Sequence, residues 1–295
     1  MTGHLRILEP HPGILAFYDG RIPGQRFMPG PNWVDEGALS LGIASYAIVS
    51  GAQALVYDTH VSVPHALAIR AALKARGVTD FTVVLSHWHK DHVAGTAAFA
   101  GCKVIANTKT AAHLALHQAD IESGQRRPPA INPLVLPTQV FDGPLQMQVG
   151  HHCVHLIRAN IHSDDATLLW LPDTGVLLAG DTVEDCCTYV AEPQDLDMHL
   201  TELDRICQLQ PSWVLPNHGS ADRIAAGGYG VGILGATQRY LRWLMRLQTD
   251  PSLSDTPLQT VIAADLADGT LDWFAPYEGV HVTNIKAVLA RASPP

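Results

Sequence analysis

Residues 81–92 read FTVVLSHWHKDH and join an apolar run directly to three histidines and an aspartate. The apolar part, residues 81–85, predicts a buried strand. Side chains on a strand point alternately to opposite faces, so His87 and His89 at its end aim in the same direction. Asp91 and His92 follow in the turn and can face the same point from another side. Imidazole and carboxylate are ligands that suit Zn²⁺, Fe²⁺ and Mn²⁺, so the stretch predicts a metal site at a strand end.

The composition of the whole chain predicts a large buried core. The chain has 295 residues, of which 47% are hydrophobic and 16% are charged, and its net charge is −9. It contains no run rich in Lys or Arg, which disfavours a nucleic-acid partner. It also has no apolar run near the ~18 residues of a membrane span and no signal-peptide pattern at its start. We therefore expect a cytoplasmic protein that acts on a small-molecule substrate, and the sequence does not predict its oligomeric state.

Strands and helices alternate along the chain. Short apolar runs between turn residues predict strands over 14–18, 45–49, 54–57, 81–85, 103–106, 145–149, 153–158, 167–171, 176–179 and 213–215. Amphipathic stretches predict helices over 63–76, 93–100, 108–120, 195–209, 231–248, 257–267 and 282–291. A Pro-rich loop is expected over 122–139. Each half of the chain has polar clusters at strand ends, which predicts two sheet layers with helices outside.

Three further candidate ligands lie where apolar strands stop. His162 follows the strand 153–158, Asp181 follows the apolar run 176–180, and His218 ends the stretch WVLPNH. Functional residues usually lie at such loop positions on a rigid scaffold. Each also has an ordinary structural explanation, since Asp181, for example, could cap a helix. Taken together, the order of these residues along the chain supports their interpretation as ligands of one metal site.

That order resembles the metallo-β-lactamase superfamily. The pattern is His-x-His-x-Asp-His, a later His, Gly-Asp, and Pro-x-His-Gly, and it covers about residues 40–220. The resemblance implies an α/β fold, the αββα sandwich, as a single domain over residues 1–295 with a core at about 10–220 and a helical extension over 221–295. It also implies one metal held by His87, His89 and His162 and a second held by Asp91, His92 and His218. Asp181 would bridge the two, and Asp58, after an early strand, would orient a ligand histidine.

The details point away from a true β-lactamase. The stretch IHSDDATLLWLP, residues 161–172, is similar to the corresponding segment of zinc β-lactamases, but those enzymes lack a bridging aspartate. The full ligand set looks more like glyoxalase II, lactonases and phosphodiesterases of the superfamily. Acyl-homoserine lactonases have Tyr where this chain has Glu184, and glyoxalase II usually has Gly-Gly where this chain has Gly95 followed by Thr96. The substrate class therefore stays open.

The implied activity is metal-dependent hydrolysis. Two divalent ions about 3.5–4 Å apart can share a hydroxide and make it available at neutral pH. Such a site would cleave a small ester, lactone, thioester or amide without a serine or cysteine nucleophile. Zinc is the first expectation for both ions, and iron or manganese would also suit the ligands. Asp91 would lie beside the attacked centre and is the candidate general acid.

Three other functions remain as alternatives. A phosphodiesterase or nuclease of the same fold is disfavoured by the acidic composition. An iron redox member of the same fold normally adds a flavodoxin-like domain, whose alternating pattern does not follow residue 220. A non-catalytic binding protein would have no physical need for all seven ligand-type residues.

Several other side chains are candidates for contact with substrate. Trp88 and Lys90 lie between the expected ligands, although Lys90 could instead pair with an acid outside the site. Glu184 is either a solvated acid or a residue at the mouth of the site. His281 opens the last helix and could reach the substrate, because C-terminal segments often do so in the superfamily. His113 and His117 are four residues apart on a helix, and we expect them to be exposed to solvent.

Overall fold

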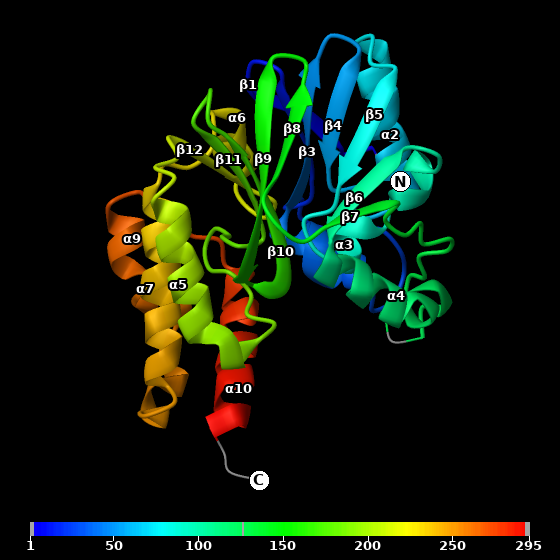
Figure 1. Cartoon of the computed structure of the whole chain (residues 1–295). Helices are drawn as coiled ribbons and strands as arrows, with labels where there is room; N and C mark the ends of the chain where they lie inside the picture. The colour runs from blue at the N-terminus through cyan, green and yellow to red at the C-terminus, as the bar shows by residue number, and fades with distance from the viewer. Residues whose placement is uncertain (1–2, 126, 293–295) are drawn as a thin grey trace.

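Two β-sheets lie face to face at the centre of the computed structural model, and helices cover both outer faces (Figure 1). The structure describes residues 3–125 and 127–292. The strands are β1(Arg6–His11), β2(Ile14–Asp19), β3(Ile43–Ser50), β4(Gln53–Tyr57), β5(Asp80–Val84), β6(Lys103–Asn107), β7(Gln139–Phe141), β8(Leu145–Val149), β9(His152–Ile161), β10(Ser163–Leu171), β11(Val176–Gly180) and β12(Trp213–Pro216). The helices are η1(Val34–Ala38), α1(Leu39–Leu41), α2(Val63–Ala75), α3(Lys90–Val93), η2(Thr96–Phe99), α4(Thr108–Ser123), η3(Pro193–Asp195), α5(Leu196–Cys207), α6(Ala221–Ala225), α7(Gly232–Arg246), η4(Pro251–Asp255), α8(Leu258–Val261), α9(Ala263–Ala267) and α10(Tyr277–Ala292). The αββα architecture expected from the sequence is confirmed.

The order of strands brings several strand ends to one edge of the sandwich. The first sheet has the order β1-β2-β3-β4-β5-β6-β7, antiparallel as far as β4 and parallel from β4 to β7. The second has the order β12-β11-β10-β9-β8, in which only β11 and β12 are parallel. Parallel neighbours end at the same edge, so the loops after β4 and β5 lie together, as do those after β11 and β12.

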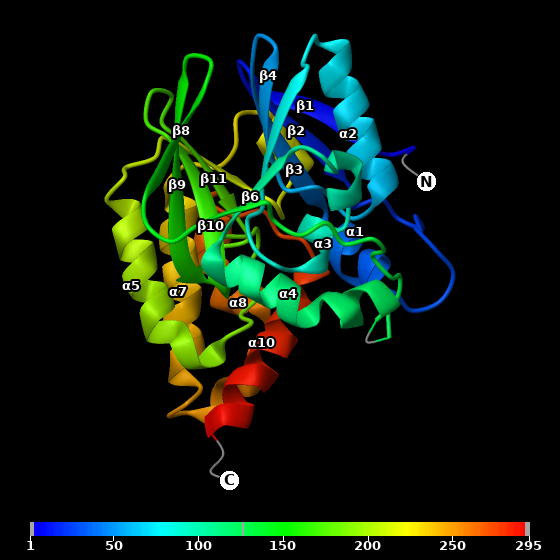
Figure 2. The same cartoon turned by 45° about the vertical axis from the view of Figure 1, so that its right-hand side comes forward.

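Three apolar layers hold the sandwich together. The layer between the sheets contains alternate residues of the inner strands, such as Tyr46 and Ile48 of β3 and Leu169 and Leu171 of β10. A second layer lies between the first sheet and the helices α2 and α4, and a third between the second sheet and the helices α5, α7 and α10. Figure 2 shows α5 and α7 beside β9 and α2 beside the first sheet, on opposite sides of the molecule. Successive side chains on a strand point to opposite faces of its sheet. Because an apolar layer covers both faces of each sheet, most positions along the inner strands are apolar.

Buried tyrosines connect the first sheet to the second. The hydroxyl groups of Tyr18, Tyr46 and Tyr57 donate hydrogen bonds to backbone carbonyls of Gly219, Pro216 and Thr167, respectively. All three side chains are fully buried. A buried hydroxyl needs a partner, so these bonds hold β10, β12 and the loop after β12 against the first sheet.

The structure differs from the expected elements in several places. The helix expected over 93–100 is instead α3, which begins at Lys90, followed by η2. Gly95 separates the two, and a Cβ there would lie 2.1 Å from Thr59 O, so the chain must bend where it meets the loop after β4. The helix expected over 257–267 is split at Ile262 into α8 and α9. The sequence analysis did not predict five elements, namely β1, β7, η1, α1 and α6. The last four are too short to give a periodic pattern, and β1 is a polar edge strand that contains Pro10.

The helices from α7 to α10 pack on the outer face of the second sheet, whereas α6 contacts β1. The side chains of Leu244 and Tyr240 from α7 and of Val288 from α10 belong to the same apolar layer as Leu203 of α5. The aromatic ring of Tyr240 is therefore packed onto the sandwich. Within the described ranges, none of the helices combines the length and the apolar character needed to cross a membrane.

Candidate metal centre

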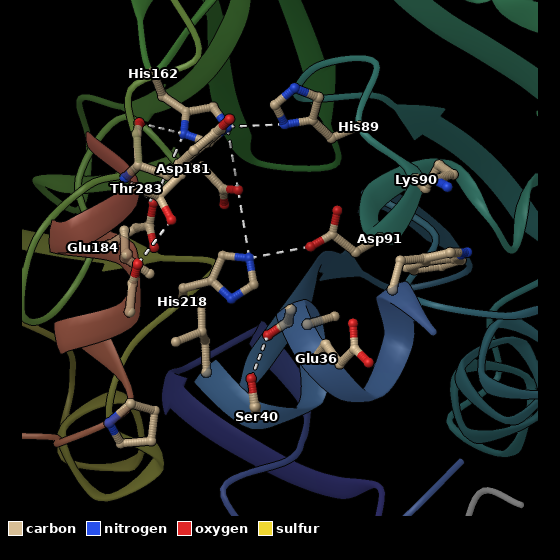
Figure 3. A pocket seen from close by; sticks show the side chains of 18 of the residues that line it. Glu36, Ser40, His89, Lys90, Asp91, His162, Asp181, Glu184, His218 and Thr283 are labelled. Carbon is tan, nitrogen blue, oxygen red and sulfur yellow. Dashed lines mark hydrogen bonds and ion pairs between the residues drawn. The ribbon is translucent and has the colours of Figure 1, made fainter. Parts of the chain in front are cut away.

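The predicted ligands meet at the edge of the sandwich where the strand ends converge. His87, His89, Asp91 and His92 follow β5, and His162 forms the turn between β9 and β10. Asp181 follows β11 and His218 follows β12. The structure thus brings all seven side chains to one place. Figure 3 shows five of them, His89, Asp91, His162, Asp181 and His218.

Local backbone geometry explains how two of these residues reach the cluster. Gly180 has φ of +58°, and a Cβ there would lie 2.9 Å from Tyr57 Oη, so the glycine lets the end of β11 approach the first sheet. Asp181 is thereby carried toward the loop after β5. His162 has φ of +66°, a conformation uncommon for a residue other than glycine. Such strain is often found where a side chain is held for a purpose.

The cluster contains two groups of ligand atoms with one carboxylate between them. His162 Nε2 lies 3.0 Å from His89 Nδ1, and His87 belongs to the same group. Asp91, His92 and His218 form the second group, in which Asp91 Oδ2 lies 3.3 Å from His218 Nε2.

Asp181 Oδ2 is close to both groups. It lies 3.0 Å from His92 Nε2, 3.4 Å from His218 Nε2, and 3.7 Å from both His87 Nε2 and His162 Nε2. Spacings of this kind are expected when several side chains face a common point.

Hydrogen bonds outside the cluster orient its imidazoles. His162 Nδ1 lies 2.9 Å from Tyr189 O, and His218 Nδ1 lies 2.7 Å from Gly42 O. Because a carbonyl only accepts, each Nδ1 carries a proton and each Nε2 points toward the cluster. His87 Nδ1 lies 2.9 Å from Ser86 Oγ, which likewise directs Nε2 inward. This is the usual outer arrangement of metal-binding histidines.

Asp58 orients His92 in the same manner. Its Oδ2 lies 2.9 Å from His92 Nδ1, and its Oδ1 accepts a hydrogen bond of 2.7 Å from the backbone N–H of Ser86. Asn217 Nδ2 donates to the same carboxylate at 2.5 Å. Asp58 therefore connects the loops after β4, β5 and β12, in the position that the sequence comparison with the superfamily implied.

Burial and charge set the protonation of the cluster. Burial lowers the pKa of His87, His89 and His162, to about 3 for His162, so these three imidazoles are neutral. Burial also lowers the pKa of His218, but the adjacent Asp181 outweighs it and holds that pKa well above the usual value. Burial raises the pKa of Asp181, but His92 and His218 hold it well below its usual range. The group formed by His87, His89 and His162 is thus neutral, and the carboxylate of Asp181 is ionised.

Two buried atoms in the cluster lack any hydrogen-bond partner among the described residues. These atoms are His87 Nε2 and Asp181 Oδ1. An unsatisfied buried polar atom destabilises a fold by about 1–3 kcal/mol, so such atoms call for an explanation. Both belong to the cluster, and both are atoms that ligate divalent metals. The donor set of imidazoles and carboxylates therefore fits metal ions.

A pocket of about 570 Å³ opens onto the cluster. Its floor is formed by His89, Asp91, His162, Asp181 and His218. One wall comes from η1, α1 and the loop after β5, and the opposite wall from the segment after β11 and from α10. The other lining residues are Trp33, Glu36, Gly37, Ala38, Ser40, Leu41, Trp88, Lys90, Arg127, Glu184, Tyr189, Pro276, Gly279, Val280 and Thr283. A cavity of this size suits a small organic molecule.

The predicted substrate contacts have different outcomes. Trp88, Lys90 and Glu184 line the pocket. Glu184 is buried and receives hydrogen bonds from Tyr189 N and from the hydroxyl of Tyr277, so the solvated alternative was wrong. Burial raises the pKa of Glu184 to about 7.

His281 does not line the pocket. It is buried on another face of α10, where Nδ1 lies 3.0 Å from Tyr240 Oη and Nε2 lies 3.0 Å from Thr256 O. The expectation that it contacts substrate was therefore wrong, because helical periodicity turns Gly279, Val280 and Thr283 toward the pocket instead. His113 and His117 are half-buried rather than exposed, since their rings stack against Trp88.

Sequence reasoning missed the wall formed by residues 33–41. These residues precede the pattern of ligands, and their helices are too short to give a periodic signal. The two tryptophans, Trp33 and Trp88, were the available hint, because aromatic side chains often line ligand pockets.

Comparison with known proteins agrees with this geometry. The sequence model of the metallo-beta-lactamase superfamily matches residues 40–218. The chain is 25% identical over 185 residues to the beta-lactamase-like protein 2 homolog of Drosophila melanogaster, covering 61% of this chain and 59% of that protein. It is 28% identical over 183 residues to an atrochrysone carboxyl ACP thioesterase of Passalora fulva, covering 61% of this chain and 49% of that protein. The chain thus spans about half to three fifths of the length of these curated relatives.

Solved structures share the fold. A metallo-beta-lactamase from Pontibacter korlensis superposes with a TM-score of 0.61 at 16% identity, covering 81% of this chain and 99% of that one. The DIM-1 metallo-beta-lactamase gives a TM-score of 0.58 at 17% identity, with 81% and 98% coverage. At these identities the likeness concerns the fold alone. Since the superfamily model covers most of the chain and includes every predicted ligand, the chain belongs to the metallo-beta-lactamase superfamily.

Proposed function

We propose that the chain is a dinuclear metal-dependent hydrolase that cleaves a small ester, lactone, thioester or amide. The observation that carries this proposal is the convergence of five imidazoles and two carboxylates in one cluster, of which three imidazoles and both carboxylates form the floor of a pocket, with two buried atoms of the cluster unsatisfied. Membership of a largely hydrolytic superfamily supports the same conclusion.

The two groups of ligand atoms suggest how two ions would be held. His87, His89 and His162 would bind one ion, and Asp91, His92 and His218 would bind the second. Asp181, which lies close to both groups, would bridge them. We propose zinc as the first candidate, with iron or manganese as alternatives that the same ligands accept. When bound, the ions would activate a water molecule as the nucleophile and polarise the bond to be cleaved.

The protein's own groups would position the substrate and move a proton. The side chain of Asp91 is 20% exposed, whereas that of Asp181 is 4% exposed. Asp91 is therefore the carboxylate that can face the substrate, and we assign it the transfer of a proton from the attacking water to the leaving group. The segment carrying Glu184 and Tyr189 lines the opposite side of the pocket.

The substrate class is supported by the shape of the pocket and by one relative. The walls present aromatic and aliphatic side chains next to the polar floor, which suits an acyl group. The relative from Passalora fulva is named as a thioesterase, so thioesters belong among the first compounds to test.

We also infer that the C-terminal helices belong to the same domain as the sandwich. Asn284 of α10 accepts a hydrogen bond from Val190 N and donates one to Thr188 O. These bonds attach α10 to the segment after β11, so the helix is one wall of the pocket rather than a separate unit. Limited proteolysis should release no stable fragment that ends near residue 220.

Metal analysis combined with a substrate panel tests the proposed function. The purified protein should contain close to two equivalents of divalent metal by mass spectrometry. A panel of esters, lactones, thioesters, β-lactams and bis-(p-nitrophenyl) phosphate should show turnover of a carboxyl compound that chelation abolishes and one added metal restores. Turnover that survives removal of the metal, or turnover of the phosphodiester alone, would contradict the proposal.

A further inference from the structure

We propose that Lys90 binds an anionic group of the substrate, a carboxylate or a phosphate, so that this site acts on acyl compounds with a negatively charged end. The inference rests on the proposed hydrolase function and adds a substrate class to it. Lys90 lies between the expected ligands His89 and Asp91, at the start of α3. Figure 3 shows it on the side of the cluster opposite Glu184 and Thr283.

The charges along the pocket leave this ammonium group without an acidic partner. Among the residues that the structure describes, two cationic side chains other than histidine line the pocket, Lys90 and Arg127. Arg127 Nη2 is bound to Glu36 Oε2 at 2.6 Å, so both of those charges are satisfied. Lys90 Nζ donates a hydrogen bond of 3.0 Å to the backbone carbonyl of Arg127, and within the described part of the chain no carboxylate pairs with it.

The surroundings of Lys90 strengthen its attraction for an anion. The side chain is half-buried, and its Nζ lies 5.4 Å from the centre of the Trp33 ring. A cation next to apolar surface is less well hydrated than one on an open surface, so it attracts an anion more strongly. Asp91, the nearest acid in the chain, is directed to His218 and His92 instead.

The neighbouring wall would hold the uncharged part of such a substrate. Trp33 is fixed by a hydrogen bond of 2.9 Å from its Nε1 to Pro129 O, and Trp88 is stacked against His117 with ring centroids 4.8 Å apart. Both rings line the pocket. An acyl chain lying along these rings would place its carbonyl group over the metal centre and its charged end near Lys90.

Two esters of equal length test the inference. 4-Nitrophenyl pentanoate and 4-nitrophenyl hemiglutarate both have five-carbon acyl chains, but only the second ends in a carboxylate. The rate of hydrolysis without enzyme is subtracted, and kcat/KM for the charged ester is divided by kcat/KM for the neutral ester. We expect Lys90→Gln to lower this ratio by about tenfold, because one charge-assisted contact is lost. Lys90→Arg should retain most of the preference. Lys74→Gln, which changes an exposed lysine on α2, should leave the ratio unchanged.

A binding measurement makes the inference independent of turnover. Titration with glutarate and with inorganic phosphate, followed by tryptophan fluorescence, should give a Kd about tenfold higher in Lys90→Gln than in the unaltered protein for at least one anion. Tighter binding of glutarate would identify a carboxylate, and tighter binding of phosphate a phosphate. Equal Kd values for both anions in the two proteins, or an unchanged ester ratio, would overturn the inference. If metal-loaded protein hydrolyses no compound of the panel, the proposed function fails, and the titration alone then decides the role of Lys90.

Discussion

Replacing Asp58 by Asn should weaken metal binding without unfolding the protein. The carboxylate accepts hydrogen bonds from His92 Nδ1, Ser86 N and Asn217 Nδ2 at 2.9, 2.7 and 2.5 Å. An asparagine has one acceptor oxygen and one donor nitrogen, so it cannot accept all three. If its oxygen keeps the bond to Ser86, its NH₂ group faces His92 Nδ1, which must then lose its proton. The proton moves to Nε2, the atom that should bind metal.

The structure gives the size of both effects. One or more buried donors lose their acceptor, which should lower the free energy of unfolding by roughly 1–3 kcal/mol. Metal affinity should fall by roughly 10- to 100-fold, the usual effect of removing a group that orients a ligand histidine. Urea denaturation measures the first quantity, and competition for metal with a chromogenic chelator measures the second.

The chain contains a matched control for this substitution. Asp19 is also buried, and its Oδ2 lies 3.0 Å from His65 Nε2, but neither residue belongs to the metal cluster. Asp19→Asn should therefore lower the free energy of unfolding by a similar amount and leave metal affinity unchanged. Equal metal affinities in Asp58→Asn and the unaltered protein would refute the reasoning about the His92 tautomer.

Three further predictions concern the cluster, its backbone and a buried histidine. His87→Ala and Asp181→Ala should each keep the circular dichroism spectrum but lose metal and hydrolytic activity; full activity without bound metal in either variant would exclude the assigned ligands. Gly180→Ala should lower the free energy of unfolding by about 1–2 kcal/mol because of the left-handed backbone at this position, and by a further amount because the new Cβ would contact Tyr57. Gly51 also has a positive φ but has open space around it, so Gly51→Ala should show only the backbone cost. Equal urea midpoints for the two variants would contradict this prediction. Burial lowers the pKa of His199 from 6.5 to about 4, so the folded state binds fewer protons than the unfolded state, and stability should fall by up to about 3 kcal/mol as pH drops from 6.5 to 4. His199→Leu should show a smaller fall over that range in urea denaturation, and an identical fall would show that His199 is not the group responsible.

Much of the fold was predictable because its signals are local. The strands β2 to β6 and β8 to β12 contain apolar stretches, which alternate with polar residues in β8. The helices α2 and α4 follow residues whose side chains cap them, Ser62 and Asn107. The elements that were missed are short or carry polar side chains on an edge, as in β1 and β7. For such elements the stabilising contacts come from neighbours in space rather than from the local pattern.

The pocket walls show where sequence reasoning stops. The residues of η1 and α1 and the inward face of α10 lie far from the ligands along the chain, and they have no motif. His281 illustrates the difficulty, because its neighbours Val280 and Thr283 on the same helix line the pocket while its own ring is bonded to Tyr240. Which face of a helix meets the pocket depends on how the helix packs.

The identities and the order of the ligand residues are properties of the sequence alone, since a strand followed by His-x-His-x-Asp-His directs its side chains by backbone geometry. From these the superfamily and a metal centre could be inferred before any coordinates. Only the tertiary structure decided that Asp181 lies within 4 Å of four imidazoles from three different loops, and that Lys90 lines the pocket with no carboxylate of the described residues paired to it. The reason is physical: the chemistry of a residue is local, but the distance between residues from separate strands depends on how two sheets pack.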